Sequence, residues 1–271
     1  MKNQFKLLII LCFISANLTS AQSVVTPSVY YTYGAYSNEN NSKDYSGYLS
    51  IKLAARGDYM IAGYDKLLIT NPDYEFDQKM FVAGIIKNQY PFYLKLNYAN
   101  INGDYNSSLD PLLNYTDKTN VINGGILYNF DLYFIGVSYT YTNLNGLSSV
   151  NSNQIGADFI WNTSSNFILS IKPLYTKVSD GRSLVSSNIK FDFPISTKVR
   201  FSAEGSFGKR AYYFNPDLLT IYNQDETQKT TISVRGEYQL FKFLRLITSY
   251  QYAEFDSFNI KYIIGGLKFS L

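Results

Sequence analysis

The dominant pattern along the chain is an alternation of apolar and polar residues with a period of two. It is clearest in 230–240, where Ile232 and Val234 fall on one face and Ser233 and Arg235 fall on the other. Successive side chains of a β-strand point to opposite sides of the sheet, so this pattern predicts a strand with one apolar and one polar face. The same alternation recurs in 185–193 and 198–207 and across most of the chain.

This periodicity predicts an all-β chain of about fourteen strands, with 12 or 16 as the alternatives. Many of the strands run for 11–13 residues, whereas strands of globular proteins are nearer to about 5–6 residues and tilted membrane-crossing strands need about 9–11. No run of 18 apolar residues follows the first segment, so no spanning helix is expected there. Alternation is weakest in 58–69 and 78–87. The expected strands are 27–37, 45–56, 58–69, 78–87, 91–101, 117–130, 132–143, 152–162, 165–177, 182–193, 197–209, 227–240, 243–255 and 258–271.

The connections between these strands fall into two sets that alternate along the chain. One set consists of one to three residues, and the other is mostly longer. Outer-membrane barrels have short periplasmic turns and longer outer loops, so the alternation favours a single up-and-down antiparallel transmembrane β-barrel over a secreted sandwich. The expected longer connections are 38–44, 70–77, 102–116, 144–151, 178–181, 210–226 and 256–257.

Aromatic residues gather near both ends of the expected strands. The chain holds 26 Tyr and 19 Phe, and such rings favour the headgroup level of a bilayer. Two belts are therefore expected. The first flanks the short turns and contains Tyr90, Phe92, Phe130, Tyr133, Trp161, Phe167, Phe191, Phe193, Phe241 and Phe243; the second contains Tyr36, Tyr98, Tyr139, Tyr141, Tyr175, Tyr250, Tyr252 and Phe255.

The first 21 residues have the three parts of a secretory signal peptide. Lys2 and Lys6 precede the apolar run 7–14, and small residues end at Ala21. We therefore expect 1–21 to be cleaved and 22–271 to form the barrel. Cys12, the only cysteine, would leave with the signal, so no disulfide framework is expected.

Composition narrows the chemistry. The chain has no histidine, which excludes Ser-His-Asp and Cys-His nucleophiles and imidazole metal sites. We expect no enzymatic activity, no cofactor and no metal. The spaced oxygens of Asp104 and Asp110 suggest a calcium loop only weakly, because Leu109 and Tyr115 stand where an EF-hand needs Gly and Glu. The chain has 24 basic and 21 acidic residues, and without Lys2 and Lys6 the balance is close to neutral, which gives no reason to expect nucleic-acid binding.

The final strand carries a resemblance to a known class. The signal ending, the Tyr/Asn-rich strands and the alternating Ile263, Leu267, Phe269 and Leu271 resemble bacterial outer-membrane β-barrel, porin-like proteins, with a Bacteroidota-type flavour. In that class the last strand usually ends in an aromatic residue, where this chain has Leu271. The resemblance implies the outer membrane of a Gram-negative bacterium, contact with its lipid, and insertion by the barrel-assembly machinery.

The polar faces of the strands are expected to line the lumen. A barrel of fourteen strands encloses room for water or a small solute. Basic residues outnumber acidic ones in this set, so the lumen should be electropositive. The expected lumen-lining residues are Lys52, Arg56, Lys95, Lys172, Lys190, Lys198, Arg200, Glu204, Arg235, Glu237, Arg245 and Lys268.

These features favour a channel for passive diffusion of small polar or anionic solutes. Two alternatives stay open. One is a non-conducting structural or adhesion barrel, or an accessory subunit of an envelope or secretion complex, since the charges near Arg200 and Glu237 could form an ion-pair lattice. The other is a transporter of hydrophobic compounds with a lateral opening. The oligomeric state is not determined by the sequence.

Any constriction should come from 102–116 or 210–226. The second segment contains Arg210, Tyr212, Tyr213 and Phe214, an aromatic sequence suited either to folding inward as a gate or to facing outward as a binding surface.

Overall fold

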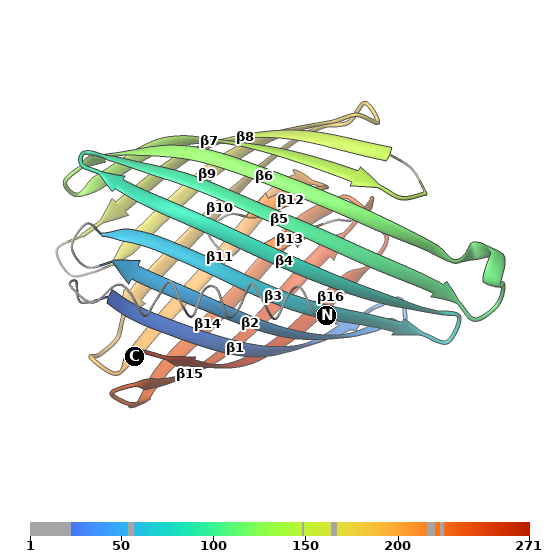
Figure 1. Ribbon diagram of the computed structural model, residues 1–271, viewed down its shortest axis with the longest axis horizontal. Helices are drawn as coiled ribbons and strands as arrows, with labels where there is room; N and C mark the ends of the chain where they lie inside the picture. The colour runs from blue at the N-terminus through green and yellow to red at the C-terminus, as the bar shows by residue number, and fades with distance from the viewer. Residues whose placement is uncertain (1–22, 54–56, 148, 164–166, 216–219, 223–224) are drawn as a thin grey trace.

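The chain folds into a closed antiparallel β-barrel of fourteen strands (Figure 1). A computed structural model describes residues 23–53, 57–147, 149–163, 167–215, 220–222 and 225–271. The all-β class, the up-and-down topology and the count of fourteen wall strands are confirmed. The expected signal segment 1–21 lies outside the described residues.

The wall strands run in chain order around the barrel, interrupted once between β11 and β14. The two regions of weakest alternation form β3 and β4, which pair along their full lengths. The wall strands are β1 (Ser23–Tyr36), β2 (Asn41–Leu53), β3 (Asp58–Asn71), β4 (Tyr74–Gln89), β5 (Phe92–Ser107), β6 (Tyr115–Phe130), β7 (Tyr133–Asn145), β8 (Ser149–Asn162), β9 (Ile168–Val178), β10 (Ser183–Pro194), β11 (Val199–Arg210), β14 (Gln228–Phe241), β15 (Leu244–Phe255) and β16 (Asn259–Phe269).

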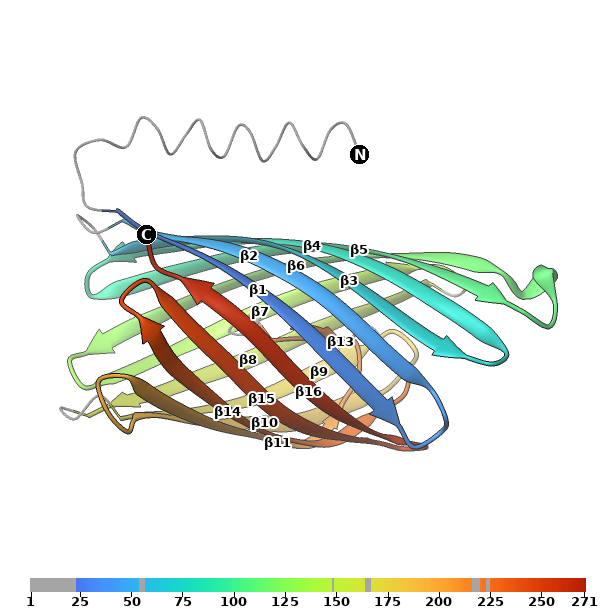
Figure 2. The ribbon, with the colours of Figure 1, turned by 90° about the horizontal axis from the view of Figure 1, so that it is seen from below.

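The first and last strands close the wall. Tyr30 of β1 lies opposite Gly266 of β16, and Val25 and Leu271 exchange backbone hydrogen bonds of 3.3 and 2.9 Å. Both ends of the barrel strand set therefore lie at the short-turn end (Figure 2). Closure leaves no edge strand, which is what a sheet in hydrocarbon requires.

The outward face of the barrel changes chemistry along its height. On β5 the outward residues run from Leu94, Leu96 and Tyr98 to Asn100 and Asn102 as the strand leaves the short-turn end. An apolar outward face fits contact with lipid, and an amide-rich one fits contact with water or headgroups. The level of Tyr98 thus marks the upper edge of the apolar band on this side.

Amide side chains bond to one another on the outward face above this level. Asn100 Nδ2 donates to Asn120 Oδ1 at 2.9 Å, and Tyr98 Oη donates to the same oxygen at 3.2 Å. On β7 and β8, Asn143 Nδ2 and Tyr141 Oη share Asn151 Oδ1 in the same way. These strands extend beyond the apolar band as a raised wall.

This extension corrects the expected loop 102–116. β5 continues to Ser107 and β6 begins at Tyr115, so only 108–114 connects them. That connection holds the single turn η1 (Pro111–Leu113), capped by Asp110 Oδ1 accepting from Leu112 N at 2.9 Å. The connections 70–77 and 144–151 are shortened for the same reason, because alternation continues there with apolar residues inward and polar residues outward. The connection 38–44 is also shortened, because β2 begins at Asn41, but its inward residues Ser42 and Asp44 are polar.

Two aromatic belts surround the barrel, with two corrections to the expected members. Near the short turns Trp161 contacts Tyr133 at 6.3 Å and Phe167 at 6.5 Å between ring centroids. At the other level Tyr36 and Phe255 were expected in the outer belt. They instead point inward and pack in one cluster with Ile260, because their positions fall on the inward phase of β1 and β15.

No helix in the described part of the chain is long and apolar enough to cross a membrane.

Candidate functional site: an inward-folded gate and a basic mouth

Near its end, β11 leaves its neighbour β10 at a glycine: Gly208 is the last residue that pairs with β10, while Arg210 still lies opposite Gln228 of β14. Gly208 has a φ of +97°, a conformation that favours glycine. A Cβ built there would lie 2.4 Å from the carbonyl oxygen of Val185, so any side chain would collide with β10. The register shifts between Phe207 and Arg210, and this bulge bends the chain toward the lumen.

We call residues 210–215 the gate. Its outer part is β12 (Tyr213–Asn215), which pairs only with β13 (Thr220–Tyr222) in a two-stranded ribbon separate from the wall (Figure 1). The Phe214 ring, the Phe214 carbonyl and the Tyr213 hydroxyl contact β4, β8 and β10, which lie in different parts of the wall. A segment that touches such distant strands lies inside the barrel, so the expected gating loop folds inward.

Arg210 anchors the base of the gate. Its side chain is buried, and Nη1 donates to Asn188 Oδ1 at 3.2 Å while Nε and Nη2 bond Gln228 and Thr231. The guanidinium also lies 5.0 Å from the ring centroid of Tyr213, a cation–π contact. These partners come from β10 and β14, so Arg210 ties the gate to the strands on both sides of β11.

Tyr212 and Tyr213 dock against the adjoining wall. Tyr212 packs in an apolar cluster with Leu144, Val150, Val178, Leu184 and Ala211. Its carbonyl accepts from Ser152 Oγ at 3.0 Å, and Asn188 Nδ2 contacts Tyr213 Oη at 2.6 Å. Burial raises the pKa of Tyr212 to about 12, so its hydroxyl stays protonated at neutral pH.

Phe214 reaches the opposite wall. Its ring is fully buried against Val82, Ala99 and Val121 of β4, β5 and β6, with Tyr48 and Ile61 packed around them. In the order of the barrel β4 lies seven strands from β11 in either direction. The gate therefore crosses the whole lumen from the strand that carries it.

Asp225, which lies between the gate and β14, is tied by Arg182 to the loop between β9 and β10. Arg182 Nη2 lies 2.9 Å from Asp225 Oδ1, and its Nε donates to Asp180 Oδ2 at 2.7 Å. The guanidinium also lies 5.7 Å from the centroid of the Tyr212 ring. The hydrogen bond from Arg182 holds the pKa of Asp180 below its ordinary value. We call this set the tether.

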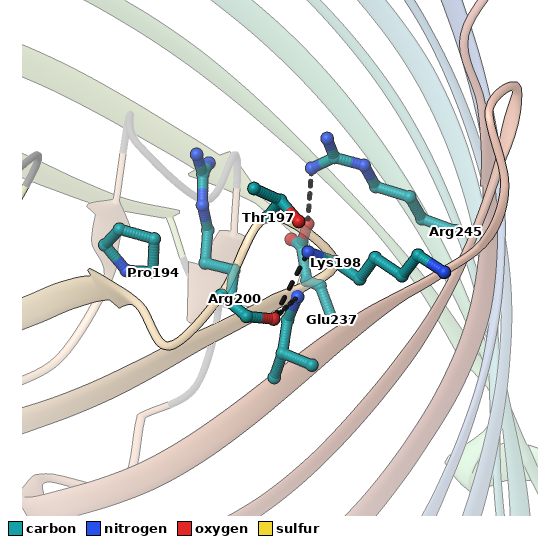
Figure 3. A pocket seen from close by; sticks show the side chains of 8 residues that line it. Pro194, Thr197, Lys198, Arg200, Glu237 and Arg245 are labelled. Atoms are coloured by element: carbon teal, nitrogen blue, oxygen red, sulfur yellow. Dashed lines mark hydrogen bonds and ion pairs between the residues drawn. The ribbon is translucent and has the colours of Figure 1, made fainter.

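Basic residues surround the short-turn mouth of the lumen (Figure 3). A pocket of about 140 Å³ there is lined by Lys198, Arg200, Arg245 and Glu237, together with Pro194 and its following turn. Arg245 Nη1 lies 3.6 Å from Glu237 Oε2, and Arg235 Nη2 lies 2.7 Å from Glu237 Oε1. One carboxylate is thus shared by two guanidinium groups, which leaves the mouth net positive.

Deeper in the wall, several charges pair. Lys172 Nζ lies 2.8 Å from Asp158 Oδ1, and both side chains are buried. Lys190 Nζ lies 2.9 Å from Asp192 Oδ2. The ion-pair lattice expected near Arg200 and Glu237 is present in part, as the contacts of Arg235 and Arg245 with Glu237. The deeper pairs neutralise the middle of the lumen more than the mouth.

The sequence-predicted lumen residues fall as follows. Lys198 lies in the turn before β11, at the rim of the mouth, and Arg56 lies outside the described residues. The others stand in the inward phase of their strands: Lys52, Lys95, Lys172, Lys190, Arg200, Glu204, Arg235, Glu237, Arg245 and Lys268.

Sequence reasoning missed inward-facing acids in the upper half of the lumen. Asp44, Asp65 and Asp117 lie on β2, β3 and β6, and Tyr48 Oη donates to Asp65 Oδ2 at 3.0 Å. Asp44 falls in an expected loop, and Asp117 at the first residue of an expected strand. Within the described ranges, no three His, Cys, Asp or Glu residues gather as a metal site.

The comparisons with known proteins identify the fold class. No family model and no curated protein matches the sequence. Among solved structures, the toluene transporter TbuX of Ralstonia pickettii is similar over 93% of this chain and 90% of its own, with a TM-score of 0.59 and 8% identity. The toluene transporter TodX of P. putida matches over 93% and 90%, with a TM-score of 0.53 and 8% identity. The chain has the fold of an outer-membrane β-barrel.

A protein of another kind shares this architecture. CdiB of Acinetobacter baumannii is similar over 91% of this chain and 60% of its own, with a TM-score of 0.52 and 8% identity. At these identities the likeness concerns the fold alone, so function has to be argued from the lumen.

Proposed function

We propose that this chain is a gated channel in the outer membrane of a Gram-negative bacterium, which passes small polar or anionic solutes. The observation that carries the proposal is the gate itself. It crosses the lumen, yet its strand β12 forms its sheet only with β13, so side chains alone attach it to the far wall.

Such an attachment suits a part that opens. Releasing the far end of the gate breaks the apolar contact of Phe214 and the hydrogen bond from Gln154 Nε2 to the Phe214 carbonyl, 3.2 Å long. Releasing Tyr212 and Tyr213 also breaks their hydrogen bonds with Ser152 and Asn188. Every strand pair of the wall stays intact. Loops that close and open a passage move in this way on the microsecond to second scale.

The basic residues of the mouth are expected to make the passage prefer anions over cations. Arg200, Arg245 and Lys198 share the pocket with a single acid, Glu237. Basic side chains around an aqueous pore attract anions and repel cations. A dissolved anion entering or leaving at the short-turn end passes these groups.

Planar bilayers containing the purified protein test this proposal. We expect current steps with a reversal potential of the anion-selective sign in a KCl gradient. The double variant Arg200→Glu/Arg245→Glu should move that potential toward cations. Lys118→Glu is the matched control, because Lys118 is exposed on the outward phase of β6, and it should leave selectivity unchanged.

Cation preference in the wild type would contradict the proposal. Silence in both the wild type and a gate-released variant would instead favour the non-conducting structural or accessory barrel.

One observation favours the alternative of lateral transport of hydrophobic compounds. The pairing of β8 with β9 stops after Gly156–Leu174 and resumes at Phe159–Ile171, and the interval includes Pro173, which has no N–H to donate. The Lys172–Asp158 ion pair bridges this interval on the lumen side, so sideways release of a hydrophobic ligand would require that pair to separate. A disulfide between Ala157→Cys and Pro173→Cys should then block toluene release while leaving chloride current intact.

A further inference from the structure

The inner wall beneath Phe214 has the properties of a ring-binding site. Val82, Ala99 and Val121 come from three adjacent strands and meet at one level, since they lie opposite one another in register. The ring that covers them is completely buried. We call these three residues, with Tyr48 and Ile61, the ring patch.

Phe214 is a movable occupant of this patch. It belongs to the gate and not to the wall, so opening the gate uncovers an apolar surface shaped around one phenyl ring. Apolar surface inside a water-filled lumen is unfavourable at about 25 cal/mol per Å². A solute with a ring of the same size would therefore be stabilised there when the gate is open.

Polar groups stand directly below the patch on the same strands. Asn97 precedes Ala99 on the inward phase of β5, and its Nδ2 donates to Asn123 Oδ1 at 2.9 Å. Lys95 is the next inward residue, about 13 Å along the strand from Ala99 at about 3.3 Å per residue. Lys95 therefore adds a positive charge on the side of the patch toward the short-turn mouth, which favours a ring that carries a carboxylate.

We propose that the ring patch binds the aromatic ring of a monocyclic aromatic carboxylate, which displaces Phe214 as it passes. This inference rests on the proposed channel function and names its solute class. Phe214 acts as a tethered competitor, so the fraction of molecules with an open gate scales the apparent affinity of the solute.

The test measures benzoate binding to the full-length protein in detergent by calorimetry, and benzoate block of chloride current in bilayers. Acetate, which has the carboxylate without the ring, is the comparison ligand. We expect benzoate to bind and block at far lower concentration than acetate. Phe214→Ala should lower the half-blocking benzoate concentration by about tenfold, because it removes the competitor.

A matched pair of wall variants locates the site. Ala99 and Ala253 are both fully buried and inward-facing, and Ala253 lies in the separate cluster with Ile260. Ala99→Ser places a hydroxyl under the ring and should weaken benzoate binding by about tenfold. Ala253→Ser should leave benzoate binding unchanged.

The outcomes separate the two proposals. Chloride current with equal responses to benzoate and acetate would overturn the ring patch and leave the channel standing. Equal effects of Ala99→Ser and Ala253→Ser would also overturn it. Silent bilayers would count against the channel, and calorimetry would still decide whether the patch binds benzoate.

Discussion

At the scale of single residues, the inward fold of the gate depends on one glycine with an unusual backbone conformation and on one buried arginine. Gly208 permits the inward turn, and Arg210 fixes it with three side-chain partners. The gating residues could be named from sequence as an aromatic cluster beside an arginine. That these residues fold into the lumen could not be predicted, because this depends on apolar wall positions across the barrel that come from strands distant in the sequence.

Replacing Gly208 should release the gate. Gly208→Ala forces a side chain into a φ of +97° against Val185, at a cost of about 1–3 kcal/mol. We expect a lower free energy of unfolding in urea titrations and a larger single-channel current. Gly124→Ala is the control, because a Cβ at Gly124 meets no atom within 4 Å. Equal behaviour of the two variants would show that the turn does not set the gate.

At the scale of elements, period-two alternation predicted every wall strand but misplaced the outer ends. The expected strand 91–101 continues to Ser107, with Ile101 and Tyr105 inward and Asn102 and Asp104 outward. The apolar face switches from outside to inside at this height because the outer surroundings switch from lipid to water, while inward side chains such as Leu144 and Val150 pack against the gate. The alternation continues without a break past residue 101, with the polar residues now outward and the apolar residues inward. That pattern would have shown that the strand extends to Ser107.

The tether makes the gate sensitive to acid. Asp180 has a lowered pKa in the folded protein. The ionised carboxylate therefore stabilises the tether fully above the ordinary Asp pKa of about 3.9, and this stabilisation is lost as the pH falls through the lower pKa of the folded state. We expect the same current between pH 8 and pH 5 and a rise below about pH 4. Asp180→Asn, which does not ionise there, should lack this acid-dependent rise.

Arg182→Ala should raise the current already at neutral pH, because it removes the contacts with both Asp180 and Asp225. A flat response to acid in the wild type, or an unchanged current in Arg182→Ala, would show that the tether does not hold the gate.

At the scale of the whole molecule, the closed barrel combines an apolar outer band, a basic mouth and a crossing gate. The fourteen-strand architecture could be predicted because each strand carries its own alternation. The partial neutralisation of the lumen could not, since the Lys172–Asp158 pair joins strands whose register is set only on folding. The net charge at the mouth depends on such pairs and not on residue totals.

The position of the barrel in lipid can be read from its single tryptophan. Trp161 is 36% exposed on the outward face of β8 near the short turns. Brominated lipid should quench its fluorescence strongly. In the variant Ile160→Trp/Trp161→Phe the indole moves to the inward phase, and quenching should be much weaker. Weak quenching of the wild type would place the aromatic belt outside the bilayer.

The central claim is that the gate crosses the conducting path, and a reversible lock tests it most directly. Asn215 Nδ2 lies 3.4 Å from Glu204 Oε1. In Asn215→Cys/Glu204→Cys, made in a chain with Cys12→Ala, a short bis-thiosulfonate reagent should therefore join gate and wall through two reducible disulfides. We expect the cross-link to suppress the current and reduction to restore it, with neither single-cysteine variant losing its current to the same reagent. Current that persists unchanged after complete cross-linking would contradict the account.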